Sequence, residues 1–172
     1  YLAKVSDATL RLWARVLEAV PDLRLLLKGG YAVDEPTREM YRTRFVAAGL
    51  PADRFEILPR SPTVIEHLEL YGRIDIALDP TPYCGTTTTC EALWMGVPVL
   101  TLKGDRHAAR VGASLMTQVG LPDFVANSAD EYVAHAVRWS QQRAALAELR
   151  AGLRARMQAS PLCDVAGLAR AI

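Results

Sequence analysis

Four threonines stand in a row at positions 86 to 89, after a glycine and before an apolar segment. Their hydroxyls can donate hydrogen bonds to phosphate without adding charge, and Gly85 lets the backbone come close to a ligand. Glu91 follows Thr87 by four residues, so the two share one face if the segment is a helix. A carboxylate repels phosphate but accepts hydrogen bonds from a ribose diol. The pattern predicts a nucleoside diphosphate site, with phosphate at Thr86, Thr87 and Thr88 and ribose at Glu91.

A purely structural interpretation of the same residues stays open. One threonine would cap a helix, and Glu91 would be an early acid that interacts favourably with the helix dipole. Four consecutive threonines between a glycine and a carboxylate exceed what a cap requires, so we favour the ligand site. The segment is neither a Walker A nor a G-x-G-x-x-G sequence, because it lacks a following Gly-Lys-Ser/Thr and that glycine spacing.

The segments around the threonines alternate between apolar runs and helical periodicity. Apolar runs at 23–28, 54–58, 74–78 and 97–102 predict strands, with a short edge strand at 124–126. Helices are predicted at about 6–20, 36–49, 61–71, 87–95 and 107–119, and from 128 onward with a break at 159–165. Ser6, Gly49 and the pair Ser128 and Glu131 supply start and stop signals. This alternation is typical of an α/β fold with a doubly wound parallel sheet.

The predicted fold puts the threonine segment at the edge of the sheet where ligands bind. In an open parallel sheet, ligands bind beyond the carboxyl ends of the strands. The strand at 74–78 runs directly into the threonine segment, and the following helix points its N-terminus at that edge. Free backbone N–H groups and the positive end of a helix dipole favour a bound phosphate.

Composition narrows the function classes. The chain has 172 residues, is 51% hydrophobic and carries a net charge of +1, so it has a sizeable core and no global field that would attract nucleic acid or a membrane. No apolar run reaches the roughly 20 residues that span a bilayer. Three cysteines without a C-x-x-C pair favour a reducing, cytoplasmic compartment and argue against a thiolate zinc site. The chain begins at Tyr1, so we expect it to be part of a larger protein.

Specific motifs resemble a known family. The segment PYCGTTTTCEALWMGVPVLTLKGDRHAARVGASLMTQVGL, with LAKVSDATLRLWARVLEAVPDLRLLLK upstream and NSADEYV and SPLC downstream, resembles the catalytic region of the TPR-containing protein O-GlcNAc transferases and SPINDLY proteins. The resemblance covers nearly the whole chain. It implies a glycosyltransferase-B architecture in which residues 1–172 form the Rossmann-like, nucleotide-sugar-binding C-terminal lobe, with a helical tail from about 128 to 172. The N-terminal catalytic lobe and the TPR repeats would lie outside this chain.

The resemblance also assigns roles to individual residues. Lys4 matches the family lysine that contacts the donor diphosphate and supports its departure, and His67 matches a histidine near the nucleotide base. Thr86, Thr87 and Thr88 match the diphosphate-binding trio, and Glu91 the acid on the ribose. From the sequence alone, Lys4 would be an exposed lysine and His67 a helix-surface histidine.

One further segment resembles the family, and several positions differ from the family pattern. His107 and Arg110 resemble family residues that flank the same pocket, although a capping histidine and a salt-bridging arginine explain them equally well. O-GlcNAc transferases have His-Thr-Thr and an aspartate where this chain has Thr-Thr-Thr and Glu91, a lysine where it has Val64, and a glutamine where it has Tyr1. The threonine run is more similar to SPINDLY proteins, so the donor stays open between UDP-GlcNAc and GDP-fucose.

The implied activity is inverting transfer of a sugar from a nucleotide diphosphate sugar to Ser or Thr of proteins. Asp75 and Asp79 do not form the D-x-D pair of metal-dependent glycosyltransferases, so we expect no metal and no cofactor besides the donor. Expected partners are the donor, the missing N-terminal lobe and a protein acceptor bound through the TPR region. Alternatives are a nucleotide-binding module that is inactive alone, a nucleotide-sugar epimerase and a scaffold.

Overall fold

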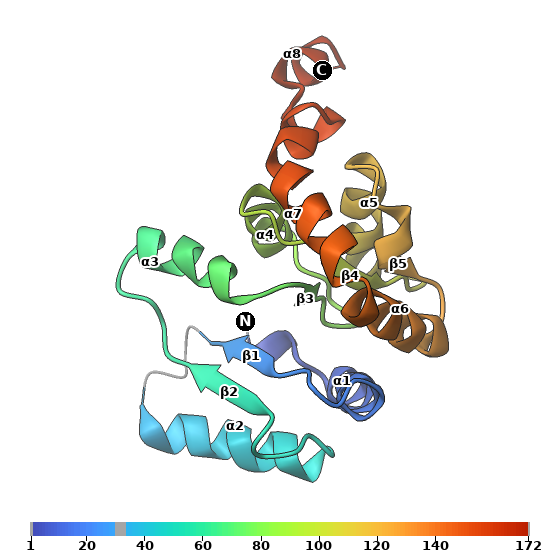
Figure 1. The fold of residues 1–172 in the computed structure, drawn as a ribbon. Helices are drawn as coiled ribbons and strands as arrows, with labels where there is room; N and C mark the ends of the chain where they lie inside the picture. Colours follow the sequence, from blue (N-terminus) through green and yellow to red (C-terminus); the bar gives the residue numbers. More distant parts are fainter. Residues whose placement is uncertain (1, 30–33, 172) are drawn as a thin grey trace.

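The computed structural model describes residues 2–29 and 34–171 of the chain, so the predictions that fall on Tyr1 lie outside the described residues. The strands of this part of the chain are β1 (Leu25–Lys28), β2 (Phe55–Leu58), β3 (Ala77–Leu78), β4 (Val99–Leu102) and β5 (Val125–Ala126). Every recorded strand pair is parallel. Helices separate the strands along the chain, which confirms the predicted α/β fold (Figure 1).

The strands form two hydrogen-bonded groups instead of one continuous sheet. β1 pairs with β2, with Leu25 opposite Phe55, and β4 lies between β3 and β5. β1 and β3 are not paired by hydrogen bonds, and their facing edges line a cavity. Within each group the parallel strands end at one edge; Lys28 ends β1, and Asp79 follows β3.

The helices begin and end close to the predicted positions. Ser6 accepts the N–H of Thr9 at 3.1 Å as the N-cap of α1, and Gly49 and Gly96 have the positive φ angles of helix C-terminal glycines. The α-helices are α1 (Asp7–Ala19), α2 (Glu35–Ala47), α3 (Val64–Glu69), α4 (Thr87–Trp94), α5 (Val111–Gln118), α6 (Ala129–Gln141), α7 (Arg143–Gln158) and α8 (Val165–Ala171). Short 3-10 turns are η1 (Leu2–Lys4), η2 (Leu70–Arg73), η3 (His107–Ala109), η4 (Pro122–Phe124) and η5 (Pro161–Cys163).

Two details of the predicted helices differ from the structure. The helix expected at 107–119 is interrupted at Arg110, with the 3-10 turn η3 before it and α5 after it. In the predicted capping box, Ser128 does accept the N–H of Glu131 at 3.1 Å, but the Glu131 carboxylate turns back to the N–H of Asn127 at 2.7 Å. The box is therefore closed one residue earlier than the usual pattern.

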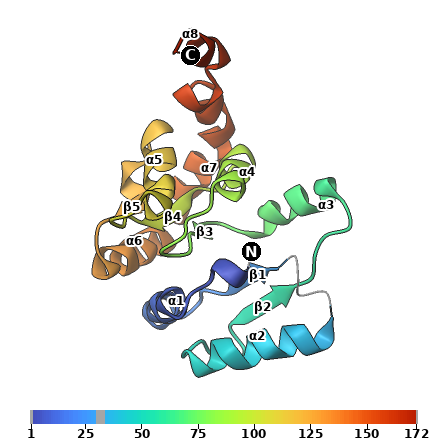
Figure 2. The ribbon, with the colours of Figure 1, turned by 180° about the vertical axis from the view of Figure 1, so that it is seen from behind.

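The core lies between the strands and the helices on both sides of them. α5 and α6 pack on opposite sides of β4 and β5, α1 packs against α6, and α4 packs against α7 (Figures 1 and 2). Trp13 and Leu93 are buried as predicted, as are Leu10 and Leu17. The prediction for Trp94 is wrong, because it is 38% exposed at the end of α4 and packs under the guanidinium of Arg154.

Part of the helical tail predicted from about 128 to 172 belongs to the core. α6 covers the strands directly, and Leu153 and Met157 of α7 are buried. Only α8 extends away, at the far end of the molecule from α2, with Val165 76% and Leu168 64% exposed (Figure 2). In the part of the chain that the structure describes, no helix is long and apolar enough to cross a membrane.

Candidate functional site

A buried carboxylate fixes the loop that leads into the threonines. Asp79 is 4% exposed, and its Oδ1 accepts the backbone N–H of Gly85 at 2.7 Å. Its Oδ2 accepts the hydroxyl of Thr101 in β4 at 2.8 Å. Burial raises the pKa of Asp79, although the hydrogen bonds from Gly85 and Thr101 act in the opposite direction. A Cβ at Gly112 would overlap Asp79 and Thr101, so α5 needs glycine there to pack this closely.

The threonine run opens α4 without capping it. Thr86 is the N-cap residue, but its side chain makes no capping hydrogen bond. Thr86, Thr87 and Thr88 are exposed, whereas Thr89 is buried in the core. The first N–H groups of a helix have no partner within the helix, so this end of α4 offers both hydroxyls and backbone donors to solvent. This arrangement speaks against the interpretation of the run as a cap.

Gly85 has a structural role in the loop before α4. It is buried, and its N–H is committed to Asp79. A Cβ at this position would lie 2.7 Å from Oγ1 of both Thr88 and Thr89. Gly85 therefore allows the threonine side chains to lie close over the loop, and in this way it shapes the site.

Lys4 lies beside the same loop. Its Nζ is 3.4 Å from the carbonyl oxygen of Cys84 and 3.9 Å from the centre of the exposed Tyr83 ring. The neighbouring start of α1 is joined to this segment, because the hydroxyls of Ser6 and Thr9 donate to the carbonyl of Thr81 at 2.7 and 2.6 Å. The structure thus brings Lys4 to the loop that leads into the threonine run, at Cys84, which is 80 residues away in the sequence.

Glu91 and His67 form a direct pair. His67 Nε2 lies 3.1 Å from Glu91 Oε2, and each side chain is 30% exposed. The Tyr71 hydroxyl donates to the carbonyl of Thr88 at 3.2 Å and reaches Glu91 Oε2 at 3.4 Å. Burial and the adjacent Glu91 carboxylate raise the pKa of Tyr71, so its hydroxyl keeps its proton and acts as a donor. His67 is therefore part of a cluster and not an isolated surface histidine.

Lys28 belongs to this cluster, and the sequence analysis missed it. Its Nζ lies 2.7 Å from His67 Nδ1 and 2.6 Å from the Ser61 hydroxyl. Partial burial lowers the pKa of Lys28, an effect that the nearby Glu91 and Glu66 oppose. One signal was present in the sequence: Lys28 is the last residue of a predicted strand, at the edge where parallel sheets bind ligands.

His107 and Arg110 lie next to the site, but among the described residues no hydrogen bond or ion pair joins their side chains to it. The backbone of their segment is attached, since the N–H of Cys84 donates to the carbonyl of Ala108 at 2.9 Å. Both side chains are exposed, and Arg110 makes a long contact of 3.5 Å with the carbonyl of Gly104. His107 caps neither η3 nor α5, whose N-cap residues are Arg106 and Arg110.

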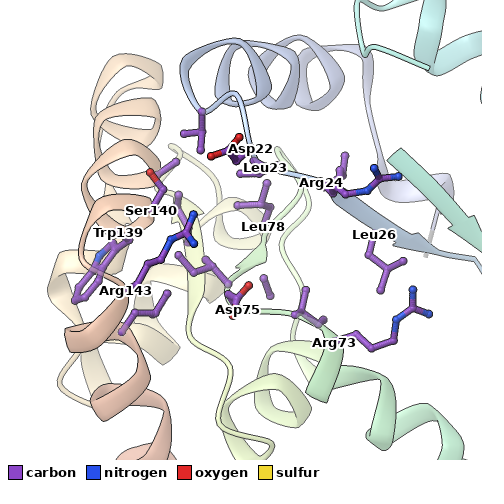
Figure 3. A pocket seen from close by; sticks show the side chains of 18 of the residues that line it. Asp22, Leu23, Arg24, Leu26, Arg73, Asp75, Leu78, Trp139, Ser140 and Arg143 are labelled. Atoms are coloured by element: carbon purple, nitrogen blue, oxygen red, sulfur yellow. The ribbon is translucent and has the colours of Figure 1, made fainter. Parts of the chain in front are cut away.

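A large cavity is separate from this site. It has a volume of about 660 Å³ and lies between the facing edges of β1 and β3, beside α1 and α6 (Figure 3). Leu26, Leu78, Asp75 and Trp139 are among its lining residues, and none of the predicted site residues lines it. Within residues 2–29 and 34–171, no group of three or more His, Cys, Asp or Glu side chains could hold a metal ion.

The fold and the site define a Rossmann-like α/β lobe with a candidate anion site at the carboxyl edge of its parallel strands. Residues 1–172 match the sequence model of glycosyl transferase family 41. The chain belongs to that family, which confirms the resemblance drawn from the threonine segment.

Individual relatives agree with this family. The chain is 42% identical over 171 residues to a probable UDP-N-acetylglucosamine-peptide N-acetylglucosaminyltransferase SPINDLY of Solanum lycopersicum, and 34% identical over 166 residues to a UDP-N-acetylglucosamine-peptide N-acetylglucosaminyltransferase of Caenorhabditis elegans. These matches cover 99% and 95% of this chain, but 18% and 14% of the relatives. A solved structure of a mutant O-GlcNAc transferase from Thermobaculum terrenum superposes with a TM-score of 0.84 at 37% identity, over 91% of this chain and 30% of that one.

Proposed function

We propose that this chain is the donor-binding lobe of an inverting glycosyltransferase that moves a sugar from a nucleotide diphosphate sugar to Ser or Thr of proteins. The observation that carries the proposal is the exposed, uncapped start of α4, where Thr86, Thr87 and Thr88 lie one helical turn from Glu91. Membership in glycosyl transferase family 41 and the names of the tomato and nematode relatives support it.

In this proposal, the diphosphate lies at the N-terminus of α4 and the ribose lies beside Glu91. The acceptor hydroxyl attacks the anomeric carbon from the face opposite the diphosphate, which departs with the bonding electrons, so the configuration inverts. Charge builds up on the departing diphosphate, and the N–H groups of α4, the hydroxyls of Thr87 and Thr88 and the ammonium of Lys4 stabilise it more in the transition state than in the ground state. These groups take the part that a metal ion has in other transferases.

The general base is assigned outside this chain or to the donor itself. Among the described residues close to the threonines, His67 is engaged by both Lys28 and Glu91. Asp79 is buried below the loop and accepts two hydrogen bonds. We propose that a second lobe completes the cleft and that a TPR region selects the protein acceptor.

The donor is proposed to be UDP-GlcNAc or GDP-fucose. The names of the relatives specify UDP-N-acetylglucosamine. Val64, where O-GlcNAc transferases carry a lysine, is an exposed residue at the start of α3 and offers no polar group to a base. Titration with UDP and GDP identifies the base.

A second candidate is a nucleotide-binding module without activity of its own. The threonine run lies on an open surface and not in the large cavity, as expected of half a cleft. A product assay separates the candidates: the complete protein that contains this chain is incubated with each donor and a Ser/Thr peptide. Glycosylated peptide supports the transferase, whereas an isomerised nucleotide sugar with unmodified peptide would indicate an epimerase. Activity that requires residues outside the 172 would assign the module role to the isolated chain.

A further inference from the structure

Three elements meet at the imidazole of His67. Lys28 comes from the end of β1, His67 from α3 and Glu91 from α4. The Lys28 Nζ lies 2.7 Å from Nδ1 of His67, and Nε2 of the same ring lies 3.1 Å from Glu91 Oε2. Both ring nitrogens are therefore engaged, one by a cation and one by an anion.

The hydrogen-bond chemistry of these groups allows one arrangement. A lysine ammonium has only donors, so Nδ1 of His67 must be the acceptor and carries no hydrogen. The ring hydrogen then lies on Nε2 and is donated to the Glu91 carboxylate. The other tautomer would direct an N–H at the ammonium and a lone pair at the carboxylate, and both contacts would be repulsive.

The consequence for Glu91 is a fixed orientation. Among the described residues, both donors that reach its carboxylate, His67 Nε2 and the Tyr71 hydroxyl, contact the same oxygen, Oε2. The second oxygen keeps its capacity to accept. With 30% of the Glu91 side chain exposed, a ligand can approach it.

We propose that Lys28 is a positioning residue of the nucleotide site: through His67 it orients Glu91, so that the free carboxylate oxygen accepts hydrogen bonds from the vicinal hydroxyls of a ribose. This inference rests on the proposed function for the identity of the ligand. The tautomer of His67 is independent of the proposed function, and it can be measured without any nucleotide. The Ser61 hydroxyl, 2.6 Å from Nζ, holds the ammonium in place.

The first test reads the imidazole directly. The chain contains three histidines, so long-range ¹H–¹⁵N correlation spectra of histidine-labelled protein at pH 8 resolve each ring. We expect His67 to carry its hydrogen on Nε2, with an Nδ1 signal that moves in Lys28→Met and is restored in Lys28→Arg, while His107 and His135 stay unchanged. A hydrogen on Nδ1, or a His67 signal that is unmoved by Lys28→Met, would overturn the proposal.

The second test asks whether Lys28 acts through His67. Lys28→Met should weaken nucleoside diphosphate binding about tenfold, as for loss of a hydrogen bond to a charged group. The same substitution should have no further effect in a His67→Ala background. Equal losses in both backgrounds, or no loss in either, would overturn the proposal. If the wild-type chain binds no nucleotide, the proposed function fails and the spectra alone decide the role of Lys28.

Discussion

The carboxylate of Asp79 accepts the backbone N–H of Gly85 at 2.7 Å, and this bond ties the end of β3 to the loop that opens α4. Its other oxygen accepts the hydroxyl of Thr101 from the neighbouring strand. One buried side chain thus fixes the threonine run relative to the sheet, although no ligand contact is assigned to it.

Asp79→Asn is expected to loosen this loop. An amide has one acceptor oxygen where the carboxylate has two, so with that oxygen on the Gly85 N–H the NH₂ group faces Thr101, whose buried O–H loses its carboxylate acceptor. An unsatisfied buried group costs about 1–3 kcal/mol. Both the free energy of unfolding and the affinity for the nucleotide should therefore fall. Denaturant titration and calorimetry measure the two effects. Asp75→Asn, at an exposed ion pair with Arg150, is the matched control and should leave affinity unchanged.

The stability of the chain should depend on pH through the same group. Because burial raises the pKa of Asp79, the folded chain binds a proton on this carboxyl at a higher pH than the unfolded chain does. The free energy of unfolding contributed by Asp79 is therefore greatest in acid and declines as pH rises from about the ordinary value of 3.9 through the raised folded pKa. The difference in unfolding free energy between wild type and Asp79→Asn should shrink over that window. A difference that grows with pH would contradict this prediction.

Gly85→Ala should disturb the site by overpacking. The added Cβ would lie 2.7 Å from the hydroxyl oxygens of Thr88 and Thr89, and such insertions typically cost about 1–3 kcal/mol. Thermal unfolding and nucleotide titration should both show the loss. Gly152→Ala in α7 is the control, since nothing lies within 4 Å of its Cβ position. It should be neutral or slightly stabilising, by up to about 1 kcal/mol.

Lys4→Met should separate binding from turnover in the complete protein. Methionine keeps the apolar stem but removes the ammonium that lies 3.4 Å from the Cys84 carbonyl. Since the proposed role of Lys4 is to stabilise charge in the transition state, kcat should fall by about 100-fold or more with a modest change in donor affinity. An unchanged kcat would remove Lys4 from the chemistry.

Local sequence signals predicted the helices and strands well. Strand and helix positions followed from apolar runs, from the Ser6 cap and from glycines at 49 and 96, because these signals act within a few residues of one another. The carboxyl-edge rule predicts the threonine run at the start of a helix beyond the third strand, where the structure has it.

Contacts between distant segments were harder to predict. Lys28 and His67 are 39 residues apart, and the sequence contains no pattern that pairs them. No sequence pattern indicates that Asp79 accepts from Gly85 and Thr101, because these bonds depend on how β3, β4 and the loop pack together. Trp94 was expected in the core because it is large and apolar, but the helix ends there and Arg154 covers its ring instead.

Calorimetric titration of the chain with UDP, GDP, UDP-GlcNAc and GDP-fucose tests most directly whether the start of α4 and Glu91 bind a nucleoside diphosphate. We predict binding of ligands that carry one of the two bases, with about tenfold weaker binding in Thr88→Ala and in Glu91→Ala, as for loss of a charge-assisted hydrogen bond. Thr43→Ala, at an exposed threonine of α2, should bind like wild type. Absence of binding, or affinity unchanged by both Thr88→Ala and Glu91→Ala, would contradict the assignment of this site.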